Sequence, residues 1–263
     1  MNRVKKLFKR LRAEGRCGVI AYVTCGDPDV AATPRIVEEL VRAGADAIEL
    51  GIPFSDPIAD GPVIQAASHR ALERGATTRD LFAIARTIRE KSEVPLIAFS
   101  YLNPVMRYGM ERFATDAAEA GIDGILLTDL PPEEADDTFR EKGLAPTFLL
   151  APTSSDKRIA AVDRASDAFV YYVSTTGVTG ARSELDPMLL ERLVEIRGKL
   201  KKPIAVGFGI SRHEHYELLR DKCDAIVVGS AIVRAINDGD AAEAPQRAGD
   251  VVRAILDNAP MPA

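Results

Sequence analysis

Cysteine and histidine are scarce in this sequence, with three residues of each among 263. The cysteines, Cys17, Cys25 and Cys223, form no CxxC pair, and their odd number argues against a disulfide framework. We therefore expect free thiols in a reducing, cytoplasmic setting. His213 and His215 are two positions apart on an expected helix, so they do not share a face and do not indicate a metal site.

The sequence context of these scarce residues predicts where each lies. Cys17 and Cys223 precede apolar runs, so we expect them to be small core residues. Cys25 falls in an expected loop, which predicts an exposed thiol with no catalytic role. The three histidines are expected to be solvated side chains on helices: His69, His213 and His215.

Long apolar runs and an excess of basic charge are also missing. No stretch approaches the ~20 apolar residues that a membrane span needs. The formal net charge of −5 argues against a nucleic-acid partner, because such proteins usually carry a basic surface. The basic, amphipathic start, VKKLFKRLR, lacks the apolar core of a signal peptide and predicts a solvated surface helix rather than membrane contact.

What remains is the composition of a soluble globular protein, 46% hydrophobic and 28% charged. No linker or low-complexity segment interrupts it, so we expect residues 1–263 to form a single domain. Eight apolar, β-branched runs recur, and they read as continuous stretches, which is typical of parallel strands covered by helices. These runs are 18–24, 47–51, 95–101, 124–129, 146–151, 169–174, 203–209 and 225–230.

Helical segments alternate with the eight runs and end at glycines such as Gly44 and Gly121. This alternation predicts an α/β fold, a (β/α)8 TIM barrel, with an extra N-terminal helix. The rival is a doubly wound open sheet, whose dinucleotide-binding form would place GxGxxG after the first strand. The first run continues instead into TCGDPD, which favours the barrel.

A local pattern repeats before several strands, as in GADAIELG and KCDAIVVG. In each copy an aspartate stands two positions before an apolar strand residue. Its expected role is to end the turn between helix and strand, not to catalyse. The four aspartates are Asp46, Asp123, Asp167 and Asp224.

The segment AIELGIPFSDPIADGP, residues 47–62, places Glu49 inside an apolar strand near its C-terminal end. Active sites of these barrels lie at that end of the strands. A desolvated Glu holds its proton to higher pH, which suits proton transfer near neutrality, so we expect Glu49 to be an acid or base. Three aspartates fall in the expected loops. Asp27 is expected to form a turn, and Asp56 to make a structural or a partner contact. For Asp60 the residues alone do not decide between a turn-forming role and a functional one.

Glycine-rich motifs end three consecutive strands: GVTG at 177–180, GFGIS at 207–211 and GSA at 229–231. Glycine lets backbone N–H groups approach an anion closely, and phosphate sites in barrels form after the seventh and eighth strands. No basic residue lies within the three motifs, which favours backbone amides as phosphate donors. Apolar and aromatic residues on the expected rim then suggest a flat, apolar ligand with a phosphorylated tail: Tyr22, Phe99, Tyr101, Leu126, Tyr171 and Phe208.

Taken in order, VTCGDPD, ELGIPFSDPIADGP, NPVMRYG, TDLP, STTGVTG, GFGIS and GSAIV resemble the alpha subunit of tryptophan synthase over nearly the whole chain. That family cleaves indole-3-glycerol phosphate to indole and glyceraldehyde 3-phosphate in a retro-aldol lyase step. By this resemblance Glu49 would protonate indole C3 and then deprotonate the glycerol hydroxyl, while Asp60 would stabilise positive charge on the indole. The resemblance also implies substrate contacts from Tyr22, Phe99, Leu126, Tyr171, Thr179, Gly180, Phe208, Gly209, Gly229 and Ser230.

The resemblance further implies a partner. Pro53, Asp56 and Asn103 would face a beta subunit in an alpha2beta2 complex. This chain would need no cofactor or metal of its own, since pyridoxal phosphate belongs to the beta subunit. Three residues depart from the family's pattern, Tyr22, Cys25 and Thr175, and none of them removes a catalytic group.

Three other interpretations stay open from the sequence. One is another phosphate-binding barrel, an isomerase or synthase, and a second is a lyase that acts without a partner. A third is a non-enzymatic subunit that only activates a beta partner. The presence of Glu49 and Asp60 together, with no strand Lys or Cys in an obvious catalytic place, favours the lyase subunit.

Overall fold

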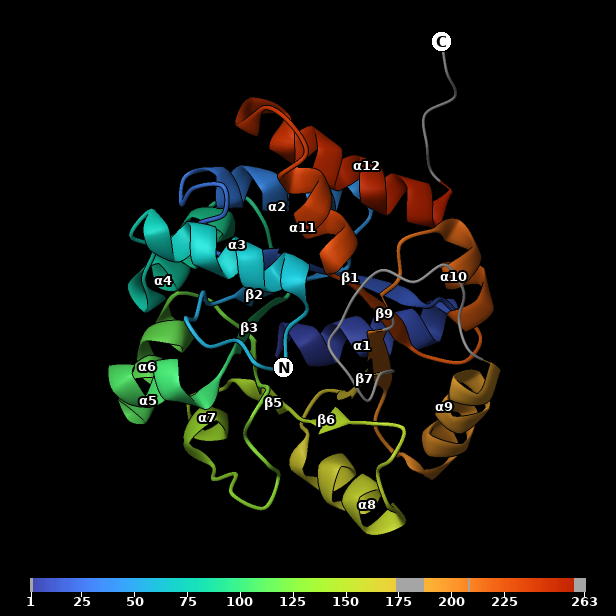
Figure 1. Ribbon diagram of the computed structural model, residues 1–263. Coiled ribbons are helices and arrows are strands. Elements are labelled where there is room, and N and C mark those ends of the chain that lie inside the picture. The colour runs from blue at the N-terminus through green and yellow to red at the C-terminus, as the bar shows by residue number, and fades with distance from the viewer. Residues whose placement is uncertain (1, 174–186, 208, 258–263) are drawn as a thin grey trace.

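The computed structural model describes residues 2–173, 187–207 and 209–257. Parallel strands form a central sheet and helices surround it (Figure 1). The strands are β1 (Gly18–Thr24), β2 (Ala47–Gly51), β3 (Leu96–Ser100), β4 (Gly124–Leu127), β5 (Ala145–Thr147), β6 (Leu149–Leu150), β7 (Val170–Val173), β8 (Ile204–Gly207) and β9 (Ala225–Val228). The helices are α1 (Arg3–Glu14), α2 (Ala32–Ala43), α3 (Pro62–Glu73), α4 (Thr78–Arg89), α5 (Leu102–Tyr108), α6 (Met110–Glu119), α7 (Thr138–Glu141), α8 (Asp156–Ala165), α9 (Pro187–Lys199), α10 (His213–Leu219), α11 (Ser230–Ile236), the 3-10 turn η1 (Ala241–Glu243) and α12 (Ala244–Leu256).

The strands close into a barrel. Their order is β5-β4-β3-β2-β1-β9-β8-β7-β6, and each hydrogen-bonded pair is parallel. The two strands at the ends of this order, β5 and β6, are separated in the chain by Phe148 alone. One continuous segment therefore joins both edges of the sheet, and the fold is the expected (β/α)8 barrel with an added N-terminal helix.

The fifth predicted strand, 146–151, is wrong as a single strand, because it consists of two short ones. Residues before Phe148 pair with β4, and residues after it pair with β7. Two features interrupt the ladder there: Pro146 has no N–H to donate, and the Phe148 N–H donates to the Ser166 hydroxyl at 3.1 Å. Each of the other predicted runs contains one strand.

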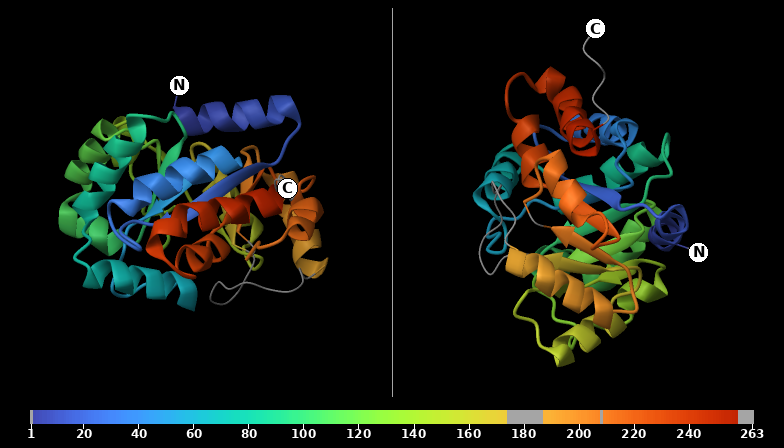
Figure 2. Two further views of the ribbon diagram at one scale, coloured as in Figure 1. Left: turned by 90° about the horizontal axis from the view of Figure 1, so that it is seen from above. Right: turned by 90° about the vertical axis from the view of Figure 1, so that its right-hand side faces the viewer.

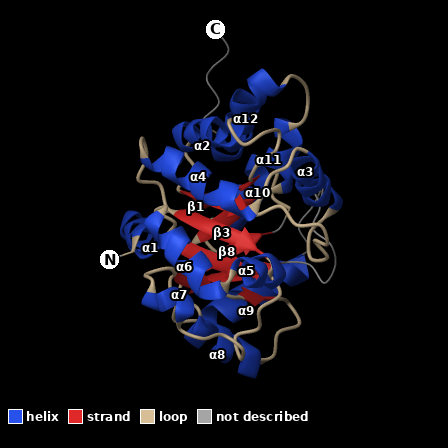
Figure 3. Cartoon of the chain, turned by 90° about the vertical axis from the view of Figure 1, so that its left-hand side faces the viewer, coloured by secondary structure: helices blue, strands red, loops and turns tan. Residues whose placement is uncertain are grey.

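Buried apolar side chains pack on both faces of the barrel wall. Ile48 and Leu50 of β2 belong to the outer cluster, which packs the strands against the helices, while Ala47 belongs to the inner one. Figure 3 shows the helices around the central strands. Since successive strand residues point to opposite faces, Glu49 points into the barrel.

Helix α1 closes the N-terminal end of the barrel (Figure 2). Val4, Leu7, Phe8 and Leu11 recur at helical spacing, are at most 4% exposed, and join the inner cluster. The ring of Phe8 lies 5.0 Å from that of Phe169. The expectation of a fully solvated helix is therefore wrong for this face, because the apolar stripe fills the open end of the barrel.

The repeated aspartates hold the turns at the same end. Asp46 accepts from the Val19 N–H at 3.0 Å, Asp123 from that of Leu96 at 3.0 Å, and Asp224 from that of Ile204 at 2.9 Å. Asp167 instead pairs with Lys5 of α1 at 2.7 Å. Each carboxylate thus fixes the start of a strand or helix α1, as expected of a structural residue.

Two of the scarce residues lie deeper than the sequence predicted. Cys25 is 0% exposed, because the loop after β1 folds over the barrel wall and its N–H donates to Gly51 O at 2.8 Å. His215 is 3% exposed, and its Nδ1 accepts from the Ser211 N–H at 3.4 Å. All three cysteines are buried free thiols, and no metal-ligating cluster occurs among the described residues. Within the same residues, no helix is long and apolar enough to cross a membrane.

Candidate active site

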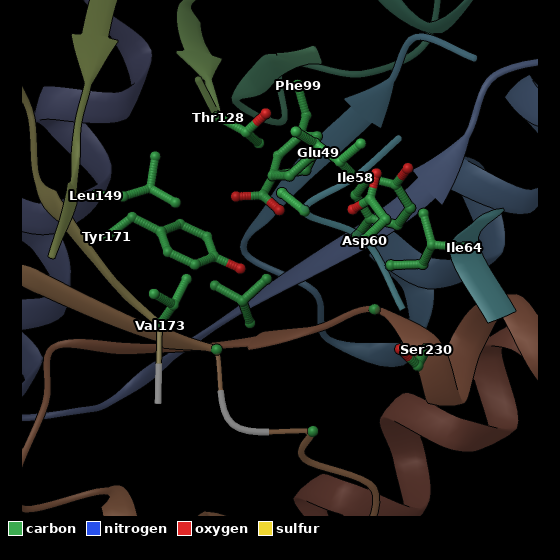
Figure 4. Close-up of a pocket in the computed structure, with 16 residues that line it drawn as sticks. Glu49, Ile58, Asp60, Ile64, Phe99, Thr128, Leu149, Tyr171, Val173 and Ser230 are labelled. Atoms are coloured by element: carbon green, nitrogen blue, oxygen red, sulfur yellow. The ribbon is translucent and has the colours of Figure 1, made fainter. Parts of the chain in front are cut away.

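A cavity of about 550 Å³ opens at the C-terminal ends of the strands, opposite α1. In Figure 4 the carboxyl group of Glu49 lies between Phe99 and Tyr171, and Asp60 lies beside Ile64. The cavity is lined by Tyr22, Glu49, Ile58, Ala59, Asp60, Ile64, Phe99, Thr128, Leu149, Tyr171, Val173, Gly207, Gly209, Val227, Gly229 and Ser230.

Glu49 is the third residue of β2, and its side chain is held inside the barrel by the strand's alternation. It is 0% exposed, and neither carboxyl oxygen has a hydrogen-bond partner among the described residues. Burial disfavours the charged form and raises the pKa of Glu49 to about 8. At neutral pH this side chain is therefore mostly protonated and can give a proton to a bound molecule.

Asp60 lies near the end of the loop between β2 and α3 and is 7% exposed. The Tyr101 hydroxyl donates to its Oδ2 at 2.9 Å and accepts from the Ala59 N–H at 2.9 Å. Burial raises the pKa of Asp60 to about 6, and the bond from Tyr101 partly opposes that rise. Asp60 is thus mostly ionised at neutral pH, in contrast to Glu49.

Aromatic rings form the walls beside the two acids. Tyr22 and Phe99 meet edge to face, with centroids 5.3 Å apart. Glycines make room for the two tyrosines: a Cβ on Gly51 would lie 2.1 Å from the Tyr22 hydroxyl, and one on Gly207 would lie 2.6 Å from the Tyr171 hydroxyl. The walls can therefore hold a flat, apolar group next to Glu49.

The far side of the cavity is formed by backbone. Gly209 has φ of 66°, a conformation that favours glycine, and Gly229 precedes the first residue of α11, Ser230. No Lys or Arg is among the described residues that line the cavity. An anion here would be bound by N–H groups and the Ser230 hydroxyl rather than by a cation.

The comparison with protein families decides the identity. A family model described as "Tryptophan synthase alpha chain" matches residues 8–258. The chain belongs to this family. The match spans every described strand and both buried acids, so it confirms the resemblance that the sequence motifs indicated.

Curated tryptophan synthase alpha chains cover nearly the same length. The chain is 54% identical to that of Solibacter usitatus over 239 residues, 90% of each chain, and 47% identical to that of Citrifermentans bemidjiense over 258 residues, 97% of each. Among solved structures, tryptophan synthase subunit alpha from Legionella pneumophila has a TM-score of 0.91 at 36% identity, with 98% of this chain and 100% of that chain covered. The tryptophan synthase a2b2 complex of Pyrococcus furiosus has a TM-score of 0.85 at 37% identity, with coverage of 91% and 98%.

The structure places most, but not all, of the predicted alpha-chain substrate residues. Tyr22, Phe99, Tyr171, Gly209, Gly229 and Ser230 line the cavity. Leu126 is 0% exposed in the inner cluster and is not among the described lining residues. Thr175, Thr179, Gly180 and Phe208 lie outside the described residues.

The residues expected to face a beta subunit differ in exposure. Asp56 and Asn103 are exposed, whereas Pro53, in the same loop as Asp56, is buried. Ile58, in the same loop, is 80% exposed at the mouth of the cavity. Exposed polar and apolar side chains therefore occur together in the segments that follow β2 and β3.

Asp27 does more than end a turn. Its carboxylate accepts two hydrogen bonds from Arg70 of α3, at 3.0 and 2.8 Å, and one from Asn237 after α11, at 2.8 Å. It is 2% exposed and lies outside the cavity lining. Asp27 thus ties the loop after β1 to the helices that flank the site.

Proposed function

We propose that Glu49 and Asp60 carry out, in this chain, the reaction of the tryptophan synthase alpha family. That reaction is the retro-aldol cleavage of indole-3-glycerol phosphate to indole and glyceraldehyde 3-phosphate. The observation that carries the assignment is the pair of buried acids in one cavity, with no ion pair to either among the described residues. By contrast, the buried carboxylates of Asp27 and Asp46 form ion pairs with Arg70 and Arg16.

Glu49 begins the proposed reaction as an acid. Its pKa of about 8 keeps a proton available at neutral pH, and this proton passes to C3 of the indole ring. The ring becomes an indolenine cation. The Glu49 carboxylate then accepts the proton of the adjacent glycerol hydroxyl. The bond from C3 to the glycerol carbon breaks, its electron pair returns to the ring, and the aldehyde forms.

Asp60 stabilises the cation that this protonation creates. With a pKa of about 6 it is mostly negative at neutral pH, and it would accept a hydrogen bond from the indole N–H. The Tyr101 hydroxyl, itself fixed by the Ala59 N–H, holds one Asp60 oxygen and leaves the other for the substrate. Tyr101 is in this scheme a positioning residue.

The remaining lining residues hold the two ends of the substrate. Tyr22, Phe99 and Tyr171 would enclose the indole, and the backbone at Gly209 and Gly229 would bind the phosphate. Binding energy from the phosphate end helps to keep the reacting bond next to Glu49. In this proposal, different residues bind the indole ring, transfer the proton and bind the phosphate.

The proposal includes a beta subunit in an alpha2beta2 complex. Its pyridoxal phosphate would act on the indole that this chain releases, and this chain would hold no cofactor of its own. Mutual activation is described for the tryptophan synthase a2b2 complex of Pyrococcus furiosus, whose alpha chain has the same fold. The exposed side chains of Asp56, Ile58 and Asn103, which follow β2 and β3, are the contacts we assign to the partner. We also assign the protein to the cytoplasm, the compartment that its three free thiols favour.

Indole release from indole-3-glycerol phosphate tests the assignment. We expect Glu49→Gln to lower kcat by about 100-fold or more, and Asp60→Asn by a similar factor. Glu111→Gln, an exposed change on α6, should leave turnover within about twofold. Circular dichroism checks that each variant is folded. If Glu49→Gln forms indole at the wild-type rate, the proton-transfer role is wrong. If the wild-type chain forms no indole with or without a beta subunit, the lyase itself is wrong.

A further inference from the structure

Two thiols face each other at the end of the barrel away from the active site. Cys17 directly precedes β1, and Cys223 lies two positions before β9, so they flank neighbouring strands. Their sulfur atoms are 3.7 Å apart although the residues are 206 positions apart in the chain. Neither the family's reaction nor the proposed site uses this pair.

The pairing of β1 with β9 places Cys17 within one residue of Cys223 on the neighbouring chain segment. Gly18 pairs with Ala225, and its N–H donates to Asp224 O at 3.0 Å. Neighbouring strands lie about 4.8 Å apart, and disulfides bridge Cα atoms about 4.4–6.8 Å apart. Bond formation would bring the sulfur atoms from 3.7 Å to about 2.05 Å, a movement that side-chain rotation can supply.

Little holds the thiols in their present positions. Each has a weak backbone contact, Cys17 with its neighbour Gly18 O at 3.7 Å and Cys223 with Leu219 O at 3.3 Å. Both cysteines are members of the buried outer cluster, and a bond between the sulfur atoms would replace these two weak polar contacts.

Both thiols also line a surface cavity, which gives a small oxidant access. This cavity, about 360 Å³ in volume, lies beside the end of α1, and Arg16 and Arg197 line it too. Cys17 is 4% and Cys223 2% exposed, whereas Cys25 is 0% exposed and is not part of the lining. The surroundings thus distinguish the pair from the third cysteine.

We propose that Cys17 and Cys223 are a reversible disulfide pair that a peroxide oxidises. In the first step a thiol sulfur is oxidised to a sulfenic acid, and hydrogen peroxide is reduced to water. In the second, the other thiol attacks that sulfur; the S–S bond forms, the S–O bond breaks, and a second water leaves. Two thiols and one peroxide give one disulfide and two waters, and a dithiol reductant reverses the change.

The electrostatics predict a slow reaction at neutral pH. The contact with Cys17, burial and the Asp224 carboxylate raise the pKa of the Cys223 thiol well above its usual range, and Arg197 only partly opposes this. Because the thiolate is the reactive form, oxidation should accelerate as pH rises. The bond would then fasten the first strand of the barrel to the last and close a long loop in the unfolded chain.

Counting thiols in the full chain tests the proposal without any variant. The reduced protein is treated with hydrogen peroxide, denatured and labelled with a maleimide. We expect three labels before oxidation, one after it, and three again after dithiothreitol. Digestion should yield one linked pair of peptides, containing Cys17 and Cys223. Three labels after oxidation of the folded protein, a bridge to Cys25, or sulfinic acid without a bridge would each overturn the proposal.

Thermal unfolding provides a second readout. The oxidised chain should unfold at a Tm about 5–10 °C higher than the reduced chain, because the bridge restricts the unfolded state. Cys25→Ser should retain this shift, and Cys17→Ser should lose it. An oxidised chain with an equal or lower Tm would show that the bridge does not fasten the barrel.

Discussion

At the scale of single residues, Glu49 combines the proposed catalytic role with an environment that disfavours its charged form. It is fully buried, and neither of its oxygens has a hydrogen-bond partner among the described residues. In the unfolded chain it ionises near its ordinary pKa of 4.5, but in the folded protein only near 8. Between these values the unfolded state binds fewer protons, so this residue lowers the free energy of unfolding progressively as pH rises from about 4.5 to 8.

Glu49→Gln should therefore stabilise the fold while it removes activity. A neutral amide of similar size avoids the ionisation penalty, and we expect the free energy of unfolding to rise by about 4 kcal/mol at pH 8. At pH 5 the gain should fall to about 1 kcal/mol or less. Urea unfolding at both pH values measures it, with Glu111→Gln as the control. An equal gain at both pH values would contradict the raised pKa.

The sequence predicted Glu49 better than it predicted the surroundings of Asp60. A carboxylate inside an apolar strand has few structural explanations, so its position alone suggests chemistry. Asp60 sits in a loop, where aspartates usually make turns, and only the family resemblance gave it a role. Its hydrogen bond with Tyr101 joins residues 41 positions apart, and no local pattern encodes that contact.

At the scale of elements, apolar periodicity predicted where the strands lie. It did not predict that the fifth strand divides into β5 and β6, or that α1 closes one end of the barrel. The run 146–151 reads as one strand because apolar spacing does not reveal that its pairing partner changes at Phe148. The spacing of Val4, Leu7 and Leu11 shows that α1 has an apolar face, but the basic residues between them favoured a surface helix. The apolar face of α1 packs into the N-terminal end of the barrel, and that end exists only once distant strands have assembled.

Phe8→Ala tests how far α1 contributes to the barrel. Phe8 is 4% exposed and packs on the Phe169 ring, so its loss leaves a cavity in the inner cluster. We expect the free energy of unfolding to fall by about 3 kcal/mol. Lys9→Ala, an exposed change one position along the same helix, should alter it by less than about 0.5 kcal/mol. If the two variants lowered the free energy of unfolding equally in urea, the packing of Phe8 inside the barrel would not contribute to stability.

At the scale of the whole molecule, the two ends of the barrel have separate tasks. One end is closed by α1, braced by the aspartates before the strands, and carries the paired thiols. The other end is open, and its loops carry Asp60 and the exposed side chains of the mouth. A partner that docks on the open end can influence the active site directly, without any change at the closed end.

Helix α5 offers a way to test that docking without disturbing the cavity. Asn103 and Met106 are three positions apart, so they share a helical face; both are exposed, Met106 by 60%, and neither lines the cavity. Replacing both by alanine should weaken binding of a beta subunit about tenfold, measured by titration calorimetry, because exposed Met side chains are favoured at interfaces. Indole release by the isolated chain should stay within about twofold. Leu218→Ala on α10, 45% exposed, serves as the control and should bind normally. Normal binding by the double variant would place the partner elsewhere on the molecule.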